Sequence, residues 1–256
     1  MKYIDLNCDM GELPDALADQ EAIMRSISSA NIACGGHAGN ANTMRTTIEQ
    51  ALRHKVAVGA HPGYEDPANF GRMEMRLSFD EIADCVHRQI LALDQIAMRL
   101  GARIGHVKPH GALYNQAAQE REIARAITDG VKRWRKDAIL VGLAGSVMLD
   151  EFHAAGFAVA AEAFADRRYE SDGSLRSRRL SDSLLTDPQA AAEQALQIVS
   201  EQTATAANGA SVSLRAQTIC IHGDTIGAAE IAAHVRRRLE EAGITIAPLG
   251  TTNPTA

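Results

Sequence analysis

Three nitrogen-bearing side chains occupy every second position of the stretch His106-Val107-Lys108-Pro109-His110. If this stretch is the end of a β-strand, His106, Lys108 and His110 share one face, because side chains alternate along a strand. Pro109 cannot donate to a sheet ladder and marks the end of regular pairing. In isolation the pattern is typical of a solvated surface strand, so its meaning depends on the other strand ends.

Polar side chains also occur where the other predicted strands end. Asp5, Asn7 and Asp9 alternate along the first predicted strand, and Glu12 follows it. The remaining strand ends carry Cys34 and His37, then His61, then Glu162, Phe164, Asp166, Arg167 and Arg168, and finally Cys220, His222 and Asp224. The carboxyl ends of parallel strands converge on one face of an α/β fold, so these groups are predicted to meet in one catalytic cleft.

Each of these residues also has an ordinary structural explanation. A lone carboxylate often caps a turn, and a buried histidine is usually satisfied by a hydrogen bond. Lys108 could pair structurally with Glu162 or Asp166. The cysteines near strand ends could be nucleophiles, although small buried cysteines are commoner. We interpret the histidines within predicted helices as packing or surface residues: His54, His87, His153 and His234.

Segments of strand and helix character alternate along the whole chain. Strands are predicted over Tyr3–Asp9, Ala30–Cys34, Val56–His61, the residues before His110, Ala138–Leu143, Phe157–Asp166, Thr218–His222 and Ile244–Leu249. Helices are predicted over Asp19–Ser28, Ala41–His54, Ser78–Gly101, Asn115–Arg135, Ser146–Ala155, Asp187–Gly209 and Ile226–Ala242. The polar, arginine-rich segment Glu170–Leu185 is predicted to be a long functional or partly mobile loop.

Repeated β-α units imply parallel strands in one α/β domain over residues 1–256. At this length a closed barrel is favoured over an open doubly wound sheet. The net charge of −6 argues against a nucleic-acid or membrane-surface protein. No apolar run reaches the ~18–20 residues that span a bilayer. Four scattered cysteines and no apparent leader segment favour free thiols and a cytoplasmic location.

Two chemistries suit the predicted cleft. Carboxylate and histidine ligands could hold a divalent metal that activates water. Alternatively, a carboxylate or histidine could act as general base while lysine and arginine neutralise an oxyanion or phosphate. The sequence lacks the His-Glu-x-x-His zinc motif and the Gly-x-x-x-x-Gly-Lys phosphate loop. Gly35-Gly36-His37-Ala38-Gly39 before a helix is a weak candidate for an anion-binding nest.

Seven sequence blocks, in order along nearly the whole chain, resemble the LamB/YcsF family. They are residues 5–12 (DLNCDMGE), 31–39 (NIACGGHAG), 59–63 (GAHPG), 70–72 (FGR), 108–115 (KPHGALYN), 162–167 (EAFADR) and 220–224 (CIHGD). Three positions depart from the family pattern: Gly36 replaces a usual Phe, Asn40 an expected Asp, and Met73 a common second Arg.

The resemblance implies a distorted (β/α)7–8 barrel, TIM-like and similar to the polysaccharide deacetylase barrels. It also implies the A subunit of an ATP-dependent 5-oxoprolinase, acting with separate B and C subunits in the cytoplasm. That enzyme converts 5-oxo-L-proline, ATP and water to L-glutamate, ADP and phosphate, with ATP as co-substrate together with Mg²⁺. A protein-bound divalent metal is a further expectation, with Asp9, His37 and His61 as candidate ligands.

On this resemblance the expected catalytic residues are Asp9, Lys108, His110 and Asp166. Asp9, or His110 paired with Asp166, would activate water. Lys108 and Arg167 would stabilise negative charge. The expected substrate-binding residues are Asn7, Glu12, His37, His61, Arg72, Tyr114, Arg167, His222 and Asp224.

Two other functions remain open from the sequence. A metal-dependent deacetylase or amidase would share the barrel and the Asp/His cluster but would need neither ATP nor partner subunits. A non-catalytic regulatory protein for lactams or carbohydrates would bind its ligand without turnover. The crowded acid–base cleft argues against the second alternative, because a binding site rarely needs so many titratable groups.

Overall fold

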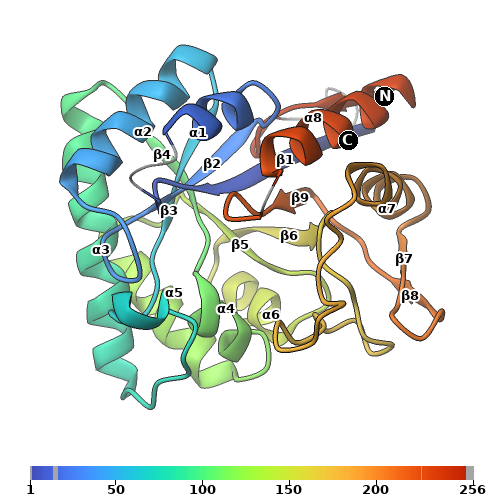
Figure 1. Cartoon of the computed structure of the whole chain (residues 1–256). Helices are drawn as coiled ribbons and strands as arrows, with labels where there is room; N and C mark the ends of the chain where they lie inside the picture. The colour runs from blue at the N-terminus through green and yellow to red at the C-terminus, as the bar shows by residue number, and fades with distance from the viewer. Residues whose placement is uncertain (1, 14–16, 226, 252–256) are drawn as a thin grey trace.

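The computed structural model describes residues 2–13, 17–225 and 227–251, and there strands and helices alternate (Figure 1). The strands are β1 (Lys2–Met10), β2 (Ser29–Ala33), β3 (Ala57–His61), β4 (Ile104–Val107), β5 (Ile139–Leu143), β6 (Ala158–Phe164), β7 (Thr203–Thr205), β8 (Ser211–Ser213), β9 (Thr218–Ile221) and β10 (Ile244–Ile246). The α-helices are α1 (Leu17–Met24), α2 (Ala41–His54), α3 (Phe79–Arg99), α4 (Gly111–Ala117), α5 (Arg121–Trp134), α6 (Val147–Ala154), α7 (Pro188–Glu201) and α8 (Ala228–Glu241).

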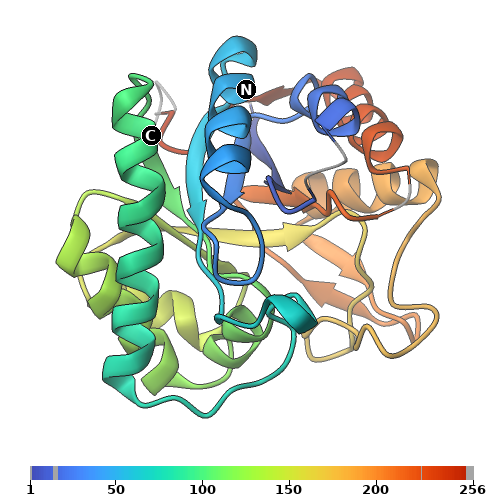
Figure 2. The ribbon, with the colours of Figure 1, turned by 60° about the vertical axis from the view of Figure 1, so that its left-hand side comes forward.

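The central strands form a closed parallel barrel. Their order is β1-β2-β3-β4-β5-β6-β9, and β1 pairs with both β2 and β9, which closes the ring. β10 adds outside the ring to the first residues of β1. Helices surround the strands, with α2 and α3 running side by side on the outside (Figure 2). The predicted (β/α) barrel is therefore confirmed, and the sheet is closed.

Side-chain alternation along β1 separates an apolar shell from a polar interior. Ile4, Leu6, Cys8 and Met10 are buried in the hydrophobic clusters beneath the surrounding helices. The intervening residues point into the barrel, where Asp5 accepts hydrogen bonds from the hydroxyls of Ser29 (2.6 Å) and Thr218 (2.5 Å). Burial raises the pKa of Asp5 to about 6, although the hydrogen bonds from its hydroxyl donors lower the pKa in part.

A glycine makes room for one histidine inside the barrel. Gly59 in β3 pairs with His106 in β4, and a Cβ atom at position 59 would overlap the His106 imidazole. Burial lowers the pKa of His106 to about 3, so the ring is neutral and its Nε2 lies 2.8 Å from Asn31 Oδ1. His106 therefore belongs to the interior network.

One long predicted helix is divided in two. The expected helix Asn115–Arg135 is wrong, because α4 ends at Ala117 and α5 begins at Arg121. Apolar residues continue at helical spacing across the break, from Ala117 to Ala124 and Val131. The sequence pattern therefore did not reveal the interruption, where Glu120 adopts an extended conformation.

The predicted helix Asp187–Gly209 is too long. Its start is correct, with Asp187 capping the amide of Ala190 and Pro188 in the first turn. It ends at Glu201, and the antiparallel hairpin of β7 and β8 follows. Asn208-Gly209 lies in the hairpin turn, a turn signal that the alanine-rich pattern obscured.

The predicted loop between β6 and α7 is confirmed, and short backbone β-bridges connect its segments. Isolated antiparallel bridges join Arg167 to Leu184 and Tyr169 to Leu175. Tyr169 is fully buried, and its hydroxyl oxygen accepts a hydrogen bond from the Phe164 backbone amide (2.7 Å). Among the described residues, no helix has both the length and the apolar character needed to cross a membrane.

Candidate active site

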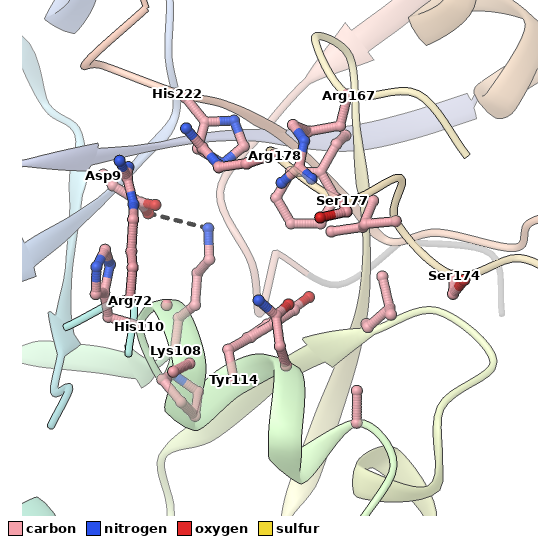
Figure 3. Close-up of a pocket in the computed structure, with 18 of the residues that line it drawn as sticks. Asp9, Arg72, Lys108, His110, Tyr114, Arg167, Ser174, Ser177, Arg178 and His222 are labelled. Carbon is pink, nitrogen blue, oxygen red and sulfur yellow. Dashed lines mark hydrogen bonds and ion pairs between the residues drawn. The ribbon is translucent and has the colours of Figure 1, made fainter. Parts of the chain in front are cut away.

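A cavity of about 520 Å³ lies at the carboxyl ends of the barrel strands. One part of its wall comes from residues that end or follow β1, β3, β4 and β9, among them Asp9, His61, Lys108 and His222. The loop between β6 and α7 supplies another part, including Arg167 and residues 174–179. Figure 3 shows these two groups of side chains on either side of the cavity.

Lys108 forms the charged centre of the cavity floor. Its Nζ lies 2.9 Å from both Asp9 Oδ1 and Glu162 Oε1, and 3.1 Å from Cys220 Sγ (Figure 3 marks the bond to Asp9). Burial alone would lower the pKa of Lys108, but the charge of Asp9, the hydrogen bond to Cys220 and the charge of Glu162 raise it well above its usual range. Lys108 is therefore a fixed ammonium.

Glu162 is fully buried beneath Lys108 and connects it to two other residues. It accepts hydrogen bonds from the Tyr114 hydroxyl (2.8 Å) and from Asn7 Nδ2 (2.9 Å). Asn7 Oδ1 in turn accepts from Asn31 Nδ2 (2.7 Å). Tyr114 and Asn7, both predicted to bind substrate, thus hold the carboxylate that faces Lys108.

Asp9 is held as a carboxylate. Its Oδ1 accepts from Lys108 Nζ and from Asn31 Nδ2 (2.8 Å), and its Oδ2 lies 3.3 Å from His61 Nε2. Burial opposes ionisation, but His61 and Lys108 keep the pKa of Asp9 well below its usual range. With one oxygen already accepting two hydrogen bonds, Asp9 is better arranged to position charge than to accept a proton.

His222 and Asp166 form a carboxylate–histidine pair. His222 Nδ1 lies 2.9 Å from Asp166 Oδ1, and the His222 backbone amide donates to Asp166 Oδ2 (3.0 Å). Burial raises the pKa of Asp166, but His222 and its hydrogen bonds outweigh this effect and lower it. Donation from Nδ1 leaves the lone pair of the neutral ring on Nε2, the arrangement of a general base. His222 lines the cavity.

The expected pairing of His110 with Asp166 is wrong. Asp166 binds His222. His110 instead contacts His61, because His61 ends β3 and His110 follows the neighbouring strand β4. His110 Nδ1 is 3.0 Å from His61 Nε2, and its Nε2 donates to the Phe70 carbonyl (2.9 Å). Burial, and then the neighbouring imidazoles of His61 and His37, hold the pKa of His110 well below its usual range.

Glu12 and His37 complete this histidine cluster. His37 Nε2 lies 3.1 Å from Glu12 Oε1, and the His37 ring stacks on His110 with centroids 3.6 Å apart. Glu12 Oε1 is also 3.5 Å from His110 Nδ1 and 3.9 Å from His61 Nε2. Burial lowers the pKa of His37, so its ring is neutral.

Arginines form the wall contributed by the loop. Arg167 is buried, donates through Nη2 to the Arg176 carbonyl (2.6 Å), and has no partner for Nε among the described atoms. Burial and the nearby charge of Arg178 lower the pKa of Arg167 to about 10. Two close guanidinium groups at a cavity wall form a site for an anion. Sequence reasoning did not single out Arg178, because it is one of several arginines in the loop.

Arg72 and Asp224 pair with each other at the rim. Their side chains are 2.5 Å apart, and Arg178 approaches the same carboxylate at 3.8 Å. The pair joins the loop after β3 to the loop after β9. Asp224 is ionised, because His222 and Arg72 lower its pKa against the effect of burial. Both residues therefore line the cavity at its rim, and their predicted role in substrate binding stays a prediction.

Two weaker expectations receive no support from the described part of the chain. Burial raises the pKa of Cys34 to about 12 and places that of Cys8 well above its usual range, so neither is an activated nucleophile. All four cysteines are buried free thiols. The glycine turn at residues 35–39 is not an open anion site, because Asn40 Oδ1 already accepts from the first amides of α2.

Comparison with known proteins gives consistent matches over nearly the whole chain. The LamB/YcsF family model matches residues 4–254. A Chloroflexus aggregans protein named as the A subunit of 5-oxoprolinase is 50% identical over 248 residues, covering 96% of this chain and 98% of that protein. The crystal structure of a lactam utilization protein from Thermus thermophilus has a TM-score of 0.89 at 44% identity, covering 96% of this chain and 99% of that chain.

A more distant match shows the fold alone. A family 4 carbohydrate esterase from Streptomyces lividans aligns with a TM-score of 0.51 at 12% identity, over 97% of this chain and 93% of that chain. The barrel thus resembles those of carbohydrate deacetylating enzymes, as expected.

Proposed function

The chain belongs to the LamB/YcsF family, and on that premise we propose that it is the A subunit of an ATP-dependent 5-oxoprolinase. It acts in the cytoplasm with separate B and C subunits and opens the lactam of 5-oxo-L-proline to give L-glutamate, while ATP, bound with Mg²⁺, yields ADP and phosphate. The observation that carries the proposal is 50% identity, over 96% of this chain, to a protein named as the A subunit of 5-oxoprolinase. The polar cavity at the strand ends supports it.

The need for ATP follows from the chemistry of the lactam. An unstrained amide resists water because resonance stabilises it, and transfer of the γ-phosphoryl group to the lactam oxygen makes the ring carbon a better electrophile. Water then adds to that carbon, and the ring C–N bond breaks with a proton passing to nitrogen. The resulting acyl phosphate reacts with a second water to give the carboxylate and phosphate, so two waters are consumed.

The residues of the cavity suit separate parts of this reaction. His222, oriented by Asp166, accepts the proton of the attacking water through Nε2. Lys108 stabilises the negative charge that develops on oxygen, because it is a buried ammonium at the cavity floor. Arg167 and Arg178 bind the anionic group, the substrate carboxylate or the transferred phosphoryl group. Asp9 fixes the position of Lys108.

Glutamate release from 5-oxoproline tests the proposal. The assay compares this protein alone with this protein plus its candidate B and C partners, each with and without Mg-ATP. We expect turnover only when all components are present, with one ADP formed per glutamate. Release of acetate from N-acetylated sugars without ATP would instead favour the deacetylase alternative, and lactam binding without any product would favour the regulatory one.

A further inference from the structure

Two imidazole nitrogens face each other across 3.0 Å, and when both rings are neutral the hydrogen bonds on their far sides leave neither of these nitrogens with a proton. His61 Nδ1 lies 2.7 Å from the Lys108 carbonyl, and His110 Nε2 lies 2.9 Å from the Phe70 carbonyl. A carbonyl oxygen can only accept, so each of these nitrogens carries its ring's hydrogen. In the neutral rings, His61 Nε2 and His110 Nδ1 therefore each carry a lone pair, and the two lone pairs point at each other.

Further acceptors surround the same point. Glu12 Oε1 is 3.5 Å from His110 Nδ1 and 3.9 Å from His61 Nε2, and Asp9 Oδ2 is 3.3 Å from His61 Nε2. Donor atoms that share a tetrahedral ion at about 2.0–2.1 Å lie about 3.3 Å apart, close to these separations. All of these groups are buried, so mutual repulsion of their lone pairs is costly unless a proton or a metal ion lies among them.

We propose that Glu12, His61 and His110 bind a divalent transition metal ion of the zinc class. Two histidines and one glutamate are a donor set of catalytic zinc sites, which keep a further position open for water or substrate. All three side chains line the cavity, so the open position faces it. A metal there would supply a Lewis acid to polarise a carbonyl or acidify a bound water.

The outer hydrogen bonds of the two histidines support this assignment. Metal-binding histidines usually donate their second ring N–H to a carbonyl or carboxylate, which fixes the ring and its tautomer. His61 and His110 both do so, through the carbonyls of Lys108 and Phe70. Gly63 and Gly71 allow the close approach, since a Cβ atom at either position would press on the His37 or His110 ring.

His37 is assigned a positioning role outside the metal shell. Its Nδ1 has no hydrogen-bond partner among the described atoms, so its hydrogen resides on Nε2 and is donated to Glu12 Oε1 (3.1 Å). His37 is not among the residues that line the cavity, and its ring lies against His110. It therefore holds the glutamate and the neighbouring imidazole in place.

A second group of residues also has the spacing of metal ligands, but its atoms already accept hydrogen bonds from a lysine. Asp9, Cys220 and His222 also bring donor atoms within 4.8 Å of one another. However, Asp9 and Cys220 both accept from Lys108 Nζ, and burial raises the pKa of the Cys220 thiol well above its usual range. The Lys108 ammonium would repel a metal ion bound by Asp9 and Cys220. We therefore place the metal at Glu12, His61 and His110.

Metal binding by the untagged full chain tests the proposal without any turnover. The protein is stripped with a chelator, dialysed against Zn²⁺ or Co²⁺, and assayed for bound metal, for cobalt visible absorption and for melting temperature. We expect about one ion per chain, the visible bands of a four- or five-coordinate cobalt site, and a melting temperature that rises with added Zn²⁺. His61→Ala and His110→Ala should lose all three signals.

Two further variants control for misfolding and for non-specific metal binding. Glu12→Gln keeps the side-chain shape and should weaken Zn²⁺ binding at least tenfold while remaining folded by circular dichroism. His153→Ala, on the exposed surface of α6, should bind like the wild type. Wild-type protein that holds no Zn²⁺ or Co²⁺ would overturn the proposal, and so would undiminished binding by folded Glu12→Gln. Either result would leave the oxoprolinase assay unaffected, because that assay measures glutamate.

Discussion

At the scale of single residues, the cavity separates fixed charges from a group suited to proton transfer. Lys108 and Asp9 neutralise each other at 2.9 Å and stay charged. His222 has its Nδ1 bound to Asp166 and lines the cavity. The carboxylate–histidine pair is therefore the place to test general base catalysis.

Replacement of Asp166 by Asn tests this pair. The amide no longer stabilises a protonated His222 and no longer fixes its tautomer, so kcat for glutamate release by the reconstituted enzyme should fall about 100-fold or more. KM should change little, because Asp166 is buried behind His222. His153→Ala is the surface control. An Asp166→Asn enzyme with wild-type kcat would remove His222 from the mechanism.

Asp5 gives a prediction for stability against pH. Its pKa is about 6 when folded against an ordinary value of 3.8, so the folded chain binds this proton more tightly than the unfolded chain. Stability from this group is fully present below pH 4 and is lost as the pH rises towards 6. The loss amounts to about 3 kcal/mol by the conversion of 1.36 kcal/mol per pH unit.

Asp5→Asn should therefore flatten the pH dependence. Urea unfolding at pH 4 to 8 should show the difference in free energy of unfolding, mutant minus wild type, rising with pH up to about 6 and then staying constant. The Asn oxygen can still accept from the hydroxyls of Ser28 and Ser29, which bond to Oδ1 of Asp5, while the Asn amide takes the place of Oδ2 beside the Thr218 hydroxyl and can only donate. A difference independent of pH would show that Asp5 titrates normally.

At the scale of elements, the loop between β6 and α7 carries the cationic wall. Arg178→Ala should weaken binding of the anionic substrate by about 10- to 100-fold, because a charge-assisted hydrogen bond contributes about 1.5–3 kcal/mol. The measurement is KM for 5-oxoproline and for ATP in the reconstituted enzyme, which also identifies the anion that the arginine contacts. Arg99→Ala, exposed on α3, is the control. Unchanged KM for both substrates would exclude the proposed role of Arg178.

The hairpin of β7 and β8 depends on one glycine. Gly209 has φ +84° in open space, so a Cβ atom there meets no neighbour and the cost is conformational. Gly209→Ala should lower the free energy of unfolding by about 1 kcal/mol. Gly105→Ala is the matched control, because Gly105 lies in β4 without a positive φ and its Cβ atom would have ordinary contacts. Equal effects of the two substitutions in urea unfolding would contradict this account.

At the scale of the whole molecule, the barrel closes around polar side chains. Gly59 leaves the space that His106 fills, and His106 bonds to Asn31 on the next strand but one. Gly59→Ala should destabilise the protein by about 2–3 kcal/mol, because the imidazole must move within a packed interior. Gly105→Ala, one residue before His106, should not. A Gly59→Ala protein with the wild-type free energy of unfolding would contradict this account, because it would show that the His106 ring can move without cost.

The sequence alone determined the element order and the groups at the strand ends. Alternation with period two placed Asp5, Asn7 and Asp9 on one face of β1, and this inference needs no tertiary contact. Caps and helical spacing set the limits of α3 in the same local way. The break before α5 and the hairpin after α7 were missed, because apolar spacing continues across the first and alanines surround the second.

Only the tertiary structure decided which strand ends are neighbours. His222 meets Asp166 because β9 pairs with β6, although α7 and the β7–β8 hairpin separate them along the chain. His110 meets His61 because β4 pairs with β3. Strand order in a closed parallel barrel depends on how all the units pack together, so a pattern within one segment carries no information about its partner.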